Sequence, residues 1–284
     1  MPLESTDASA AGSLVLGGEL EVRRLGFGAM RITGHGIWGP PADPEGARAV
    51  LRRVVKLGIN FIDTADAYGP AISEELIAEA LHPYPDELVI ATKGGLRRSG
   101  PGQWERDCSP EHLREACDAS LRRLRVDRLD LYQLHAIDPK VPLEESVGAL
   151  AELRQQGKVA HVGLSNVDRD QLERARRIVP VASVQNRYSL ADRDSESVLD
   201  RCERDRLAFI PWFPLAAGNV DRDGAIRRVA AAHGASEFQV ALAWLLARSP
   251  AMLPIPGTSS VDHLDENVAA AALRLSDEEV AELG

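Results

Sequence analysis

The chain has 284 residues, of which 44% are hydrophobic and 27% are charged, a composition typical of a globular protein. Its formal net charge of -10 argues against binding to a nucleic-acid backbone or an anionic membrane, because both reward clusters of Lys and Arg. No apolar run approaches the roughly 20 residues that a membrane helix needs. Residues 1–12 lack the basic start and the apolar run of a secretory signal.

The cysteines and the length bound the compartment and the number of domains. Cys108, Cys117 and Cys202 show neither metal-site nor disulfide-framework spacing, which suits a reducing compartment. We therefore expect a cytoplasmic protein without a metal, with no nucleic-acid or membrane partner, and either monomeric or a weak homo-oligomer. Because α/β barrels of this size form one unit, we expect a flexible tail over 1–12 and a single domain over 13–284.

A hairpin and a series of strand-like runs follow the tail. Gly17 and Gly18 separate two short apolar runs, and a Gly-Gly pair supplies the positive φ angles of a tight turn. Amphipathic segments separate the later apolar runs, which predicts parallel strands joined by helical crossovers. The eight predicted strands are 24–28, 60–63, 88–93, 129–135, 159–165, 183–186, 207–211 and 252–256. Eight strands favour a closed barrel.

Helical spacing of apolar residues predicts the crossovers between these strands. A helix over 46–57 ends at Gly58, which fits a helix C-cap, and Ser109 with Pro110 forms the N-cap and first position of a helix that ends at Leu124. The other predicted helices are 144–156, 168–177, 192–204, 224–233, 237–247, 261–271 and 277–283. Two of them lie between the last two strands, so one helix is additional to the barrel.

Ionisable residues stand at the ends of three predicted strands. Asp63 ends one strand, with Tyr68 on the loop that follows, while Lys93 and His135 end the next two. In a barrel, the C-terminal ends of the strands meet at the rim that carries the active site. Each of these residues alone is more often structural than catalytic. Together they predict one site that contains all four side chains.

These four residue types suit the protonation of a carbonyl group. A tyrosine has a reference pKa of about 10 and is a poor acid at neutral pH unless a cation stabilises its phenolate. Lys93 is the predicted cation, Asp63 keeps it charged and in place, and His135 aligns a carbonyl oxygen with Tyr68. The pattern offers neither a Ser or Cys nucleophile with its base nor a cluster of His and Cys ligands. The reducing equivalent therefore comes from elsewhere, and a nicotinamide cofactor is its natural source.

From Leu14 onward the chain resembles the aldo-keto reductases. The motifs that carry the resemblance are GINFIDTA over 58–65 with Tyr68-Gly69, GLSN over 163–166, VQN over 184–186, and IPGTS over 255–259 with Glu266-Asn267. The resemblance implies a (β/α)8 TIM barrel with an N-terminal hairpin that closes its bottom and with extra helices. It also implies that Tyr68 is the general acid and that Asp63, Lys93 and His135 complete a catalytic tetrad.

The same resemblance implies a cofactor, NADPH, and the residues that bind it. Ser165, Asn166 and Gln185 would hydrogen-bond the nicotinamide carboxamide, and Trp212 would stack on the ring. Residues 213–218 would follow the pyrophosphate with backbone N–H groups, and 257–267 would bind the adenosine end. The full set is Gly28, Ala29, Met30, Asp63, Ser165, Asn166, Gln185, Trp212, Phe213, Pro214, Leu215, Ala217, Gly218, Gly257, Thr258, Ser259, His263, Glu266 and Asn267.

The adenosine end departs from the family pattern. Where the family often places an arginine against the 2′-phosphate, this chain has His263, and Asp262 and Asp265 add negative charge nearby. NADPH is the expected cofactor, and NADH stays open as an alternative.

The substrate is expected to be a small-molecule carbonyl compound that contacts Trp38, Tyr68, Trp104 and His135. The segment Trp38-Gly39-Pro40-Pro41 resembles a bacterial branch of the family that includes pyridoxal reductases, which makes a pyridoxal-type aromatic aldehyde a narrower candidate. Arg97 and Arg98 lie in the predicted substrate loop, but arginines on loops are usually solvated, so neither is assigned to the substrate.

Two other functions stay open at this stage. The same fold can bind a nucleotide without turnover, as a sensor subunit, although an intact tetrad argues against that function. A glycosidase that pairs Asp63 with a second acid is the other alternative, and it predicts no nicotinamide binding.

Overall fold

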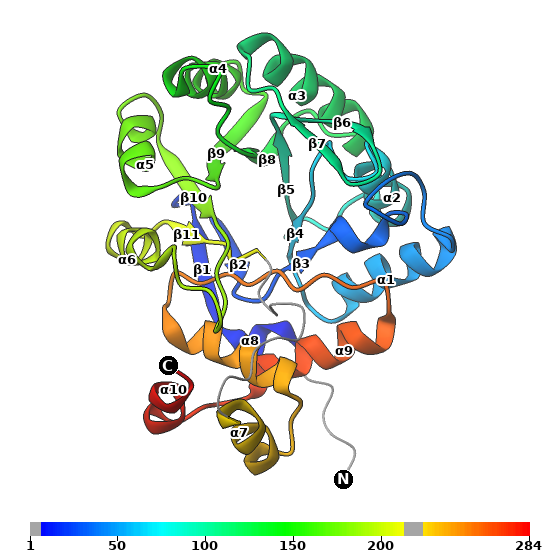
Figure 1. Ribbon diagram of the computed structural model, residues 1–284. Helices are drawn as coiled ribbons and strands as arrows, with labels where there is room; N and C mark the ends of the chain where they lie inside the picture. Colours follow the sequence, from blue (N-terminus) through cyan, green and yellow to red (C-terminus); the bar gives the residue numbers. More distant parts are fainter. Residues whose placement is uncertain (1–6, 213–223) are drawn as a thin grey trace.

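The computed structural model describes residues 7–212 and 224–284 of the chain. Its centre is a curled parallel sheet in the order β11-β10-β9-β8-β5-β4-β3, surrounded by helices (Figure 1). The strands are β3 (Phe27–Gly28), β4 (Phe61–Asp63), β5 (Val89–Gly94), β8 (Leu129–Leu134), β9 (Val159–Ser165), β10 (Val181–Gln185) and β11 (Ala208–Phe209). This arrangement confirms the predicted barrel class.

The eighth predicted strand, 252–256, closes the barrel without forming a regular strand. Met252 forms a parallel bridge with Phe209 of β11, and the Leu253 N–H donates to the Phe209 carbonyl at 2.8 Å. On the other side, the Gly26 N–H donates to the carbonyl of Pro254 at 2.9 Å. Pro254 and Pro256 have no N–H group, which prevents a continuous ladder here.

Helices surround the barrel as the alternating pattern predicts. They are α1 (Pro44–Lys56), α2 (Ile72–Leu81), α3 (Pro110–Leu124), α4 (Leu143–Gln155), α5 (Arg169–Arg176), α6 (Glu196–Asp205), α7 (Ala225–His233), α8 (Glu237–Arg248), α9 (Val261–Ala269) and α10 (Asp277–Leu283). The α7 and α10 helices lie outside the ring of helices around the sheet (Figure 1). Among the described residues, no helix combines the length and hydrophobicity needed to cross a bilayer.

Sequence reasoning missed one of these helices, α2, and misplaced the start of another. No side chain caps the N-terminus of α2, where Ala71 has a φ of 70°, and its first turn buries the polar residues Ser73 and Glu74. A polar buried turn hides the apolar periodicity that marks a helix. The α6 helix begins at Glu196 and not at Asp192, because Asp192 pairs with Ser189 in a turn.

The predicted N-terminal hairpin closes the bottom of the barrel. Its strands β1 (Ser13–Leu16) and β2 (Leu20–Arg23) are antiparallel, and Gly17 and Gly18 between them have φ angles of 63° and 83°. Leu16 and Val22 are fully buried and belong to the hydrophobic cluster inside the barrel. The hairpin therefore acts as an apolar plug.

Two further segments differ from the expectations. Part of the expected flexible tail forms a 3-10 helix, Ala8–Ala11, which is anchored by the hydrogen bond from the Ala8 N–H to the Leu57 carbonyl at 2.9 Å. The predicted substrate loop after β5 contains a second hairpin, β6 (Leu96–Gly100) and β7 (Gln103–Arg106). Its glycines and exposed polar residues give no apolar alternation from which to predict strands.

Candidate active site

A buried ion pair joins two strand ends at the C-terminal rim of the barrel. Lys93 of β5 and Asp63 of β4 are 0% and 2% exposed, and the Lys93 Nζ lies 2.7 Å from the Asp63 Oδ2. The same ammonium donates to the Thr64 carbonyl at 2.9 Å. Burial acts to lower the pKa of Lys93, but the Asp63 carboxylate and the Tyr68 hydroxyl outweigh it, so this pKa lies above its ordinary value. Lys93 is therefore a cation at neutral pH.

Two glutamine side chains hold the other carboxylate oxygen of Asp63. The Nε2 atoms of Gln133 and Gln185 donate to the Asp63 Oδ1 at 3.1 and 2.8 Å. Gln133 stands beside Gly163 in the sheet register, and a Cβ on Gly163 would lie 2.8 Å from the Gln133 Cγ. The glycine thus leaves the space through which Gln133 reaches Asp63. Sequence reasoning missed Gln133, since an isolated glutamine in an apolar strand has no recognisable motif.

Tyr68 brings its hydroxyl group to this ion pair. The Lys93 Nζ lies 3.3 Å from the Tyr68 hydroxyl oxygen and 5.0 Å from the centre of the ring. Burial raises the pKa of Tyr68 above its ordinary value, while the Lys93 ammonium acts in the opposite direction. Tyr68 is therefore protonated at neutral pH, and a cation stands ready to stabilise the phenolate that proton donation would leave.

His135 follows β8 and packs edge-on against Tyr68, with 5.7 Å between the ring centres. Burial, together with the Lys93 charge, lowers the pKa of His135 well below its ordinary value, so the imidazole is neutral. Its Nδ1 atom is buried and has no hydrogen-bond partner within the described ranges. Because a buried N–H without a partner is rare, we place the single ring proton on Nε2. The structure thus brings all four predicted catalytic residues together.

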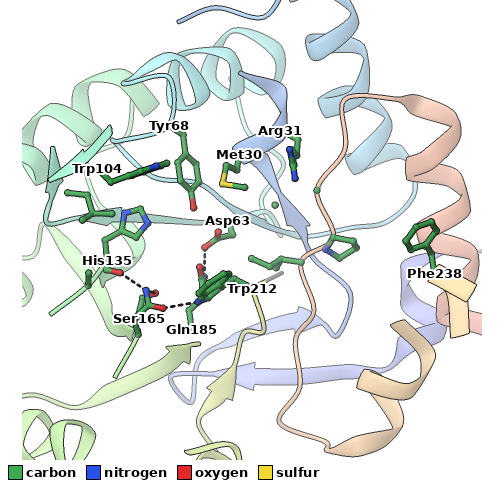
Figure 2. Close-up of a pocket in the computed structure, with 17 residues that line it drawn as sticks. Met30, Arg31, Asp63, Tyr68, Trp104, His135, Ser165, Gln185, Trp212 and Phe238 are labelled. Atoms are coloured by element: carbon green, nitrogen blue, oxygen red, sulfur yellow. Dashed lines mark hydrogen bonds between the residues drawn. The ribbon is translucent and has the colours of Figure 1, made fainter. Parts of the chain in front are cut away.

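These residues open into a cavity of about 630 Å³. Such a volume lies within the range of about 300–1,000 Å³ that is typical of ligand and cofactor sites. Trp104 and His135 lie at one end of the cavity and Phe238 at the other (Figure 2). The lining residues are Gly28, Met30, Arg31, Asp63, Tyr68, Leu96, Trp104, His135, Ala136, Ser165, Asn166, Gln185, Trp212, Phe238, Ile255, Pro256 and Gly257.

On the side of the cavity that contains Trp212, the Asn166 side chain joins three neighbouring residues by hydrogen bonds. Its Oδ1 accepts the Trp212 indole N–H at 2.9 Å, and its Nδ2 donates to the His135 carbonyl and the Ser165 Oγ, both at 3.0 Å. Asn166 adopts a left-handed φ of 59°, which this residue type tolerates. Protein partners thus engage both polar atoms of the Asn166 side chain and the Nε2 of Gln185. Their hydrogen bonds to a nicotinamide carboxamide stay a prediction.

The cavity wall formed by β3 and residues 255–257 contains two close contacts between backbone segments. A Cβ on Gly28 would lie 2.7 Å from the Ile255 carbonyl oxygen, and a Cβ on Gly257 would lie 2.5 Å from that of Gly28. Arg31 is exposed, lines the cavity beside Gly257, and forms no hydrogen bond or ion pair with any other described residue. Sequence reasoning missed Arg31 and Phe238, because neither lies in a recognisable motif.

The other residues predicted to bind the cofactor or substrate are distributed around the cavity. Thr258 and Asn267 are buried, His263 and Ser259 are exposed, and Glu266 is half-buried. Ala29 is buried beside the cavity and is not among its lining residues. Phe213, Pro214, Leu215, Ala217 and Gly218 lie outside the described residues.

Two residues are placed differently from the expectation. Trp38 is not among the residues that line the cavity. Its backbone forms a parallel bridge with Gly69, and the centre of its ring lies 5.8 Å from the guanidinium carbon of Arg98. Asp265, expected to add negative charge at the adenosine end, forms a two-point ion pair with Arg53 at 2.8 and 2.9 Å. Arg53 therefore compensates that charge.

Comparisons with known proteins agree with this arrangement. The model of the aldo/keto reductase family matches residues 24–284. An uncharacterized oxidoreductase of Schizosaccharomyces pombe is 51% identical over 280 residues, which cover 98% of this chain and 91% of the relative. Pyridoxine 4-dehydrogenase of Escherichia coli is 46% identical over 272 residues, which cover 94% of this chain and 95% of the relative.

Solved structures show the same fold. Glycerol dehydrogenase from Gluconobacter oxydans superposes with a TM-score of 0.86 at 28% identity, over 96% of this chain and 95% of the other. An aldo-keto reductase from Klebsiella pneumoniae in complex with NADPH gives a TM-score of 0.80 at 31% identity, over 95% and 93% of the two chains. These findings confirm the family resemblance, the barrel fold and the oxidoreductase class. The chain belongs to the aldo/keto reductase family of oxidoreductases.

Proposed function

We propose that this protein reduces an aldehyde or ketone to an alcohol with NADPH, and that Tyr68 donates the proton. One observation carries the proposal: the Tyr68 hydroxyl lies 3.3 Å from the ammonium of Lys93, which is itself paired with Asp63, at the wall of a cavity. A phenol beside a buried cation is suited to donate a proton and to remain as a stabilised phenolate.

The residues of the cavity fit a nicotinamide dinucleotide. Gly28 and Gly257 line the cavity, and the lack of a Cβ on each lets the backbone of β3 and that of residues 255–257 lie against each other as one of its walls. Trp212 offers a flat ring that Asn166 already orients, and Arg31 offers a cation for a phosphate group. When bound, NADPH supplies a hydride to the carbonyl carbon.

NADPH is favoured over NADH by the charges around the adenosine end. Asp265 is neutralised by Arg53, which removes one of the two acids that disfavoured a 2′-phosphate. Arg31 adds an uncompensated positive charge among the described residues that line the cavity. The Klebsiella structures with NADPH and with NADP support the same choice.

The chain's own residues would divide the reaction as follows. Neutral His135 donates one hydrogen bond from Nε2 to the carbonyl oxygen and so aims that oxygen at Tyr68. Tyr68 then transfers its hydroxyl proton to the same oxygen while Lys93 stabilises the resulting phenolate. Asp63, fixed by Gln133 and Gln185, exchanges no proton and keeps Lys93 in position.

Replacement of Tyr68 by Phe tests the proposal. General acid catalysis contributes about 10²- to 10⁴-fold, so we expect Tyr68→Phe to lower kcat/KM for an aldehyde by at least about 10²-fold. The affinity for NADPH, followed by quenching of tryptophan fluorescence, should stay within about twofold of wild type because the variant keeps the ring. Tyr84→Phe is the matched control, because its hydroxyl bonds to the Leu124 carbonyl away from the site.

The wild-type protein decides between this proposal and its rivals. Binding of NADPH without its oxidation across a broad panel of carbonyl compounds would support the sensor function instead. Failure to bind either NADPH or NADH would support a hydrolase that uses Asp63 in a carboxylate pair.

We further propose that the substrate is an aromatic aldehyde of the pyridoxal type. Support comes from the 46% identity to a pyridoxine 4-dehydrogenase. The reverse of oxidising an alcohol such as pyridoxine is the reduction of the corresponding aldehyde. Trp104, Tyr68, Met30 and Leu96 give the cavity apolar and aromatic walls against which a flat ring can pack. A higher kcat/KM for aliphatic aldehydes than for pyridoxal would contradict this choice.

The organisation of the molecule completes the proposal. We place the enzyme in the cytoplasm as a single domain over residues 13–284. The three thiols, of Cys108, Cys117 and Cys202, are free and buried, which supports a reducing compartment.

A further inference from the structure

Arg98 is bound to the backbone of three separate segments. It lies on β6 of the hairpin that follows Lys93, and its guanidinium donates five hydrogen bonds, all to backbone carbonyls. The acceptors and distances are Gln103 at 2.8 Å, Ile37 at 2.8 Å, Ala67 at 3.1 Å, Gly36 at 2.9 Å and Gly100 at 3.4 Å. Arg98 therefore joins the β6–β7 hairpin to the loop over 36–37 and to the residue that precedes Tyr68.

This environment is not that of a solvated surface arginine. A guanidinium has five N–H donors, and here the carbonyls satisfy every one of them. No carboxylate pairs with Arg98 within residues 7–212 and 224–284, and burial lowers the pKa of its guanidinium. Lysine has only three donors on a single atom and could not reach all these acceptors.

The backbone of the 36–37 loop is shaped around this cation. Gly36 and Ile37 have φ angles of 69° and 57°. The left-handed region is strained for a β-branched residue such as isoleucine. Both residues direct their carbonyls to the Arg98 guanidinium, so its hydrogen bonds offset the strain. Without them, the loop and the hairpin would lose their common anchor.

Arg98 also fixes the tryptophan that covers the catalytic residues. Its guanidinium carbon lies 3.7 Å from the Trp104 ring centre, within the range of a cation–π contact. The Trp104 ring in turn packs edge-on against both Tyr68 and His135, at 6.5 and 6.4 Å between ring centres. Figure 2 shows Trp104 beside these two residues. Trp104 lines the cavity, whereas Arg98 does not.

We propose that Arg98 is a positioning residue that sets substrate selectivity: it holds Trp104 over Tyr68 and His135 and so shapes the wall against which the substrate ring packs. This inference rests on the proposed carbonyl reduction. Arg98 touches neither the substrate nor the reacting atoms, and it acts through Trp104.

The comparison of Arg98→Lys with Arg97→Lys tests this role. Arg97 is the adjacent arginine on the same strand, with a more exposed side chain paired to Asp107, and serves as the matched control. Initial rates are measured with NADPH and two probes, pyridine-4-carbaldehyde and propanal. We expect Arg98→Lys to raise KM for the aromatic probe at least about tenfold and to change kcat/KM for propanal less than about threefold. Cofactor affinity should not change.

A double-mutant cycle with Trp104→Ala isolates the contact through which Arg98 acts. In the Trp104→Ala background, Arg98→Lys should have little further effect on KM for the aromatic probe. An equal loss for both aldehydes, or effects of the two substitutions that simply add, would overturn the proposal. If Arg98→Lys does not fold, Arg98→Gln, which keeps two of the donors, is measured in the same cycle.

Hydrogen exchange separates this inference from the proposed function. Amides of residues 96–106 should exchange at least about tenfold faster in Arg98→Lys than in wild type, and not in Arg97→Lys. If the wild-type enzyme reduced no aldehyde but exchange still accelerated, carbonyl reduction would be refuted and the anchoring by Arg98 would stand. Unchanged exchange would refute the anchoring itself.

Discussion

The Lys93–Asp63 pair allows a quantitative test of how the site is held together. Lys93→Met removes an ammonium that is fully buried and bonded to Asp63 at 2.7 Å and to the Thr64 carbonyl at 2.9 Å. Loss of one partner of a buried ion pair typically costs about 3–5 kcal/mol. Gln133 and Gln185 still donate to the other oxygen of Asp63, so we expect the lower end, about 3 kcal/mol.

Thermal unfolding followed by circular dichroism measures this loss. In a chain of this size 1 kcal/mol shifts Tm by roughly 2–4 °C, so Lys93→Met should lower Tm by roughly 6–12 °C. The double variant Lys93→Met/Asp63→Asn keeps an acceptor for the two glutamines but removes the uncompensated charge. It should therefore recover about half of the loss, although both variants should be inactive.

A surface lysine provides the control for this experiment. Lys158 pairs with Asp118 at 2.5 Å, with side chains that are 36% and 41% exposed. Exposed pairs contribute at most about 1 kcal/mol, so Lys158→Met should lower Tm by only a few degrees. The reasoning is refuted if Lys93→Met lowers Tm no more than Lys158→Met does, or if the double variant is less stable than Lys93→Met alone.

Two further predictions concern Arg31 and Asp66. Arg31→Gln should weaken NADPH binding about tenfold, as judged by fluorescence quenching, because it removes the cation beside Gly257; unchanged affinity would exclude Arg31 from the cofactor site. Burial, followed by the Glu74 charge, raises the pKa of Asp66 from 3.8 to about 8, so the folded protein keeps a proton that the unfolded chain releases above about pH 4. Stability should therefore fall as the pH rises from 5 to 8, and Asp66→Asn should reduce this decline by roughly 3–4 kcal/mol in thermal melts; an identical pH dependence in both proteins would contradict the assignment.

The barrel and its catalytic rim could be predicted because each rests on a short-range pattern. Asp63, Lys93 and His135 stand where apolar strands end, and parallel topology then brings them to one rim. The Gly17-Gly18 pair likewise predicts the turn of the hairpin to which it belongs. Each of these inferences needs only residues that are close together in the sequence.

What could not be predicted depends on contacts between distant segments. Gln133 reaches Asp63 across 70 positions of the chain, and only the absence of a Cβ at Gly163 permits that contact. Arg98 looked like a surface charge because its partners are backbone carbonyls, one of them 62 positions away at Gly36, and carbonyls carry no sequence signal. The sequence predicts that Asp265 adds negative charge near the cofactor, because its ion-pair partner Arg53 lies 212 positions away in the chain and cannot be identified from the sequence.

The same division separates the chemistry of the site from its selectivity. The proton donor is tuned by Lys93 and Asp63, which are almost fully buried on adjacent barrel strands, so few surface changes can disturb them. The wall that faces the substrate instead includes Trp104 on a hairpin that Arg98 anchors. Within residues 7–212 and 224–284, the two strands of this hairpin pair with each other and with no other strand. Substitutions in that hairpin can therefore alter which carbonyl compound fits while the Tyr68 hydroxyl keeps its distance from Lys93. A barrel that fixes the reaction and an anchored hairpin that selects the substrate can change independently.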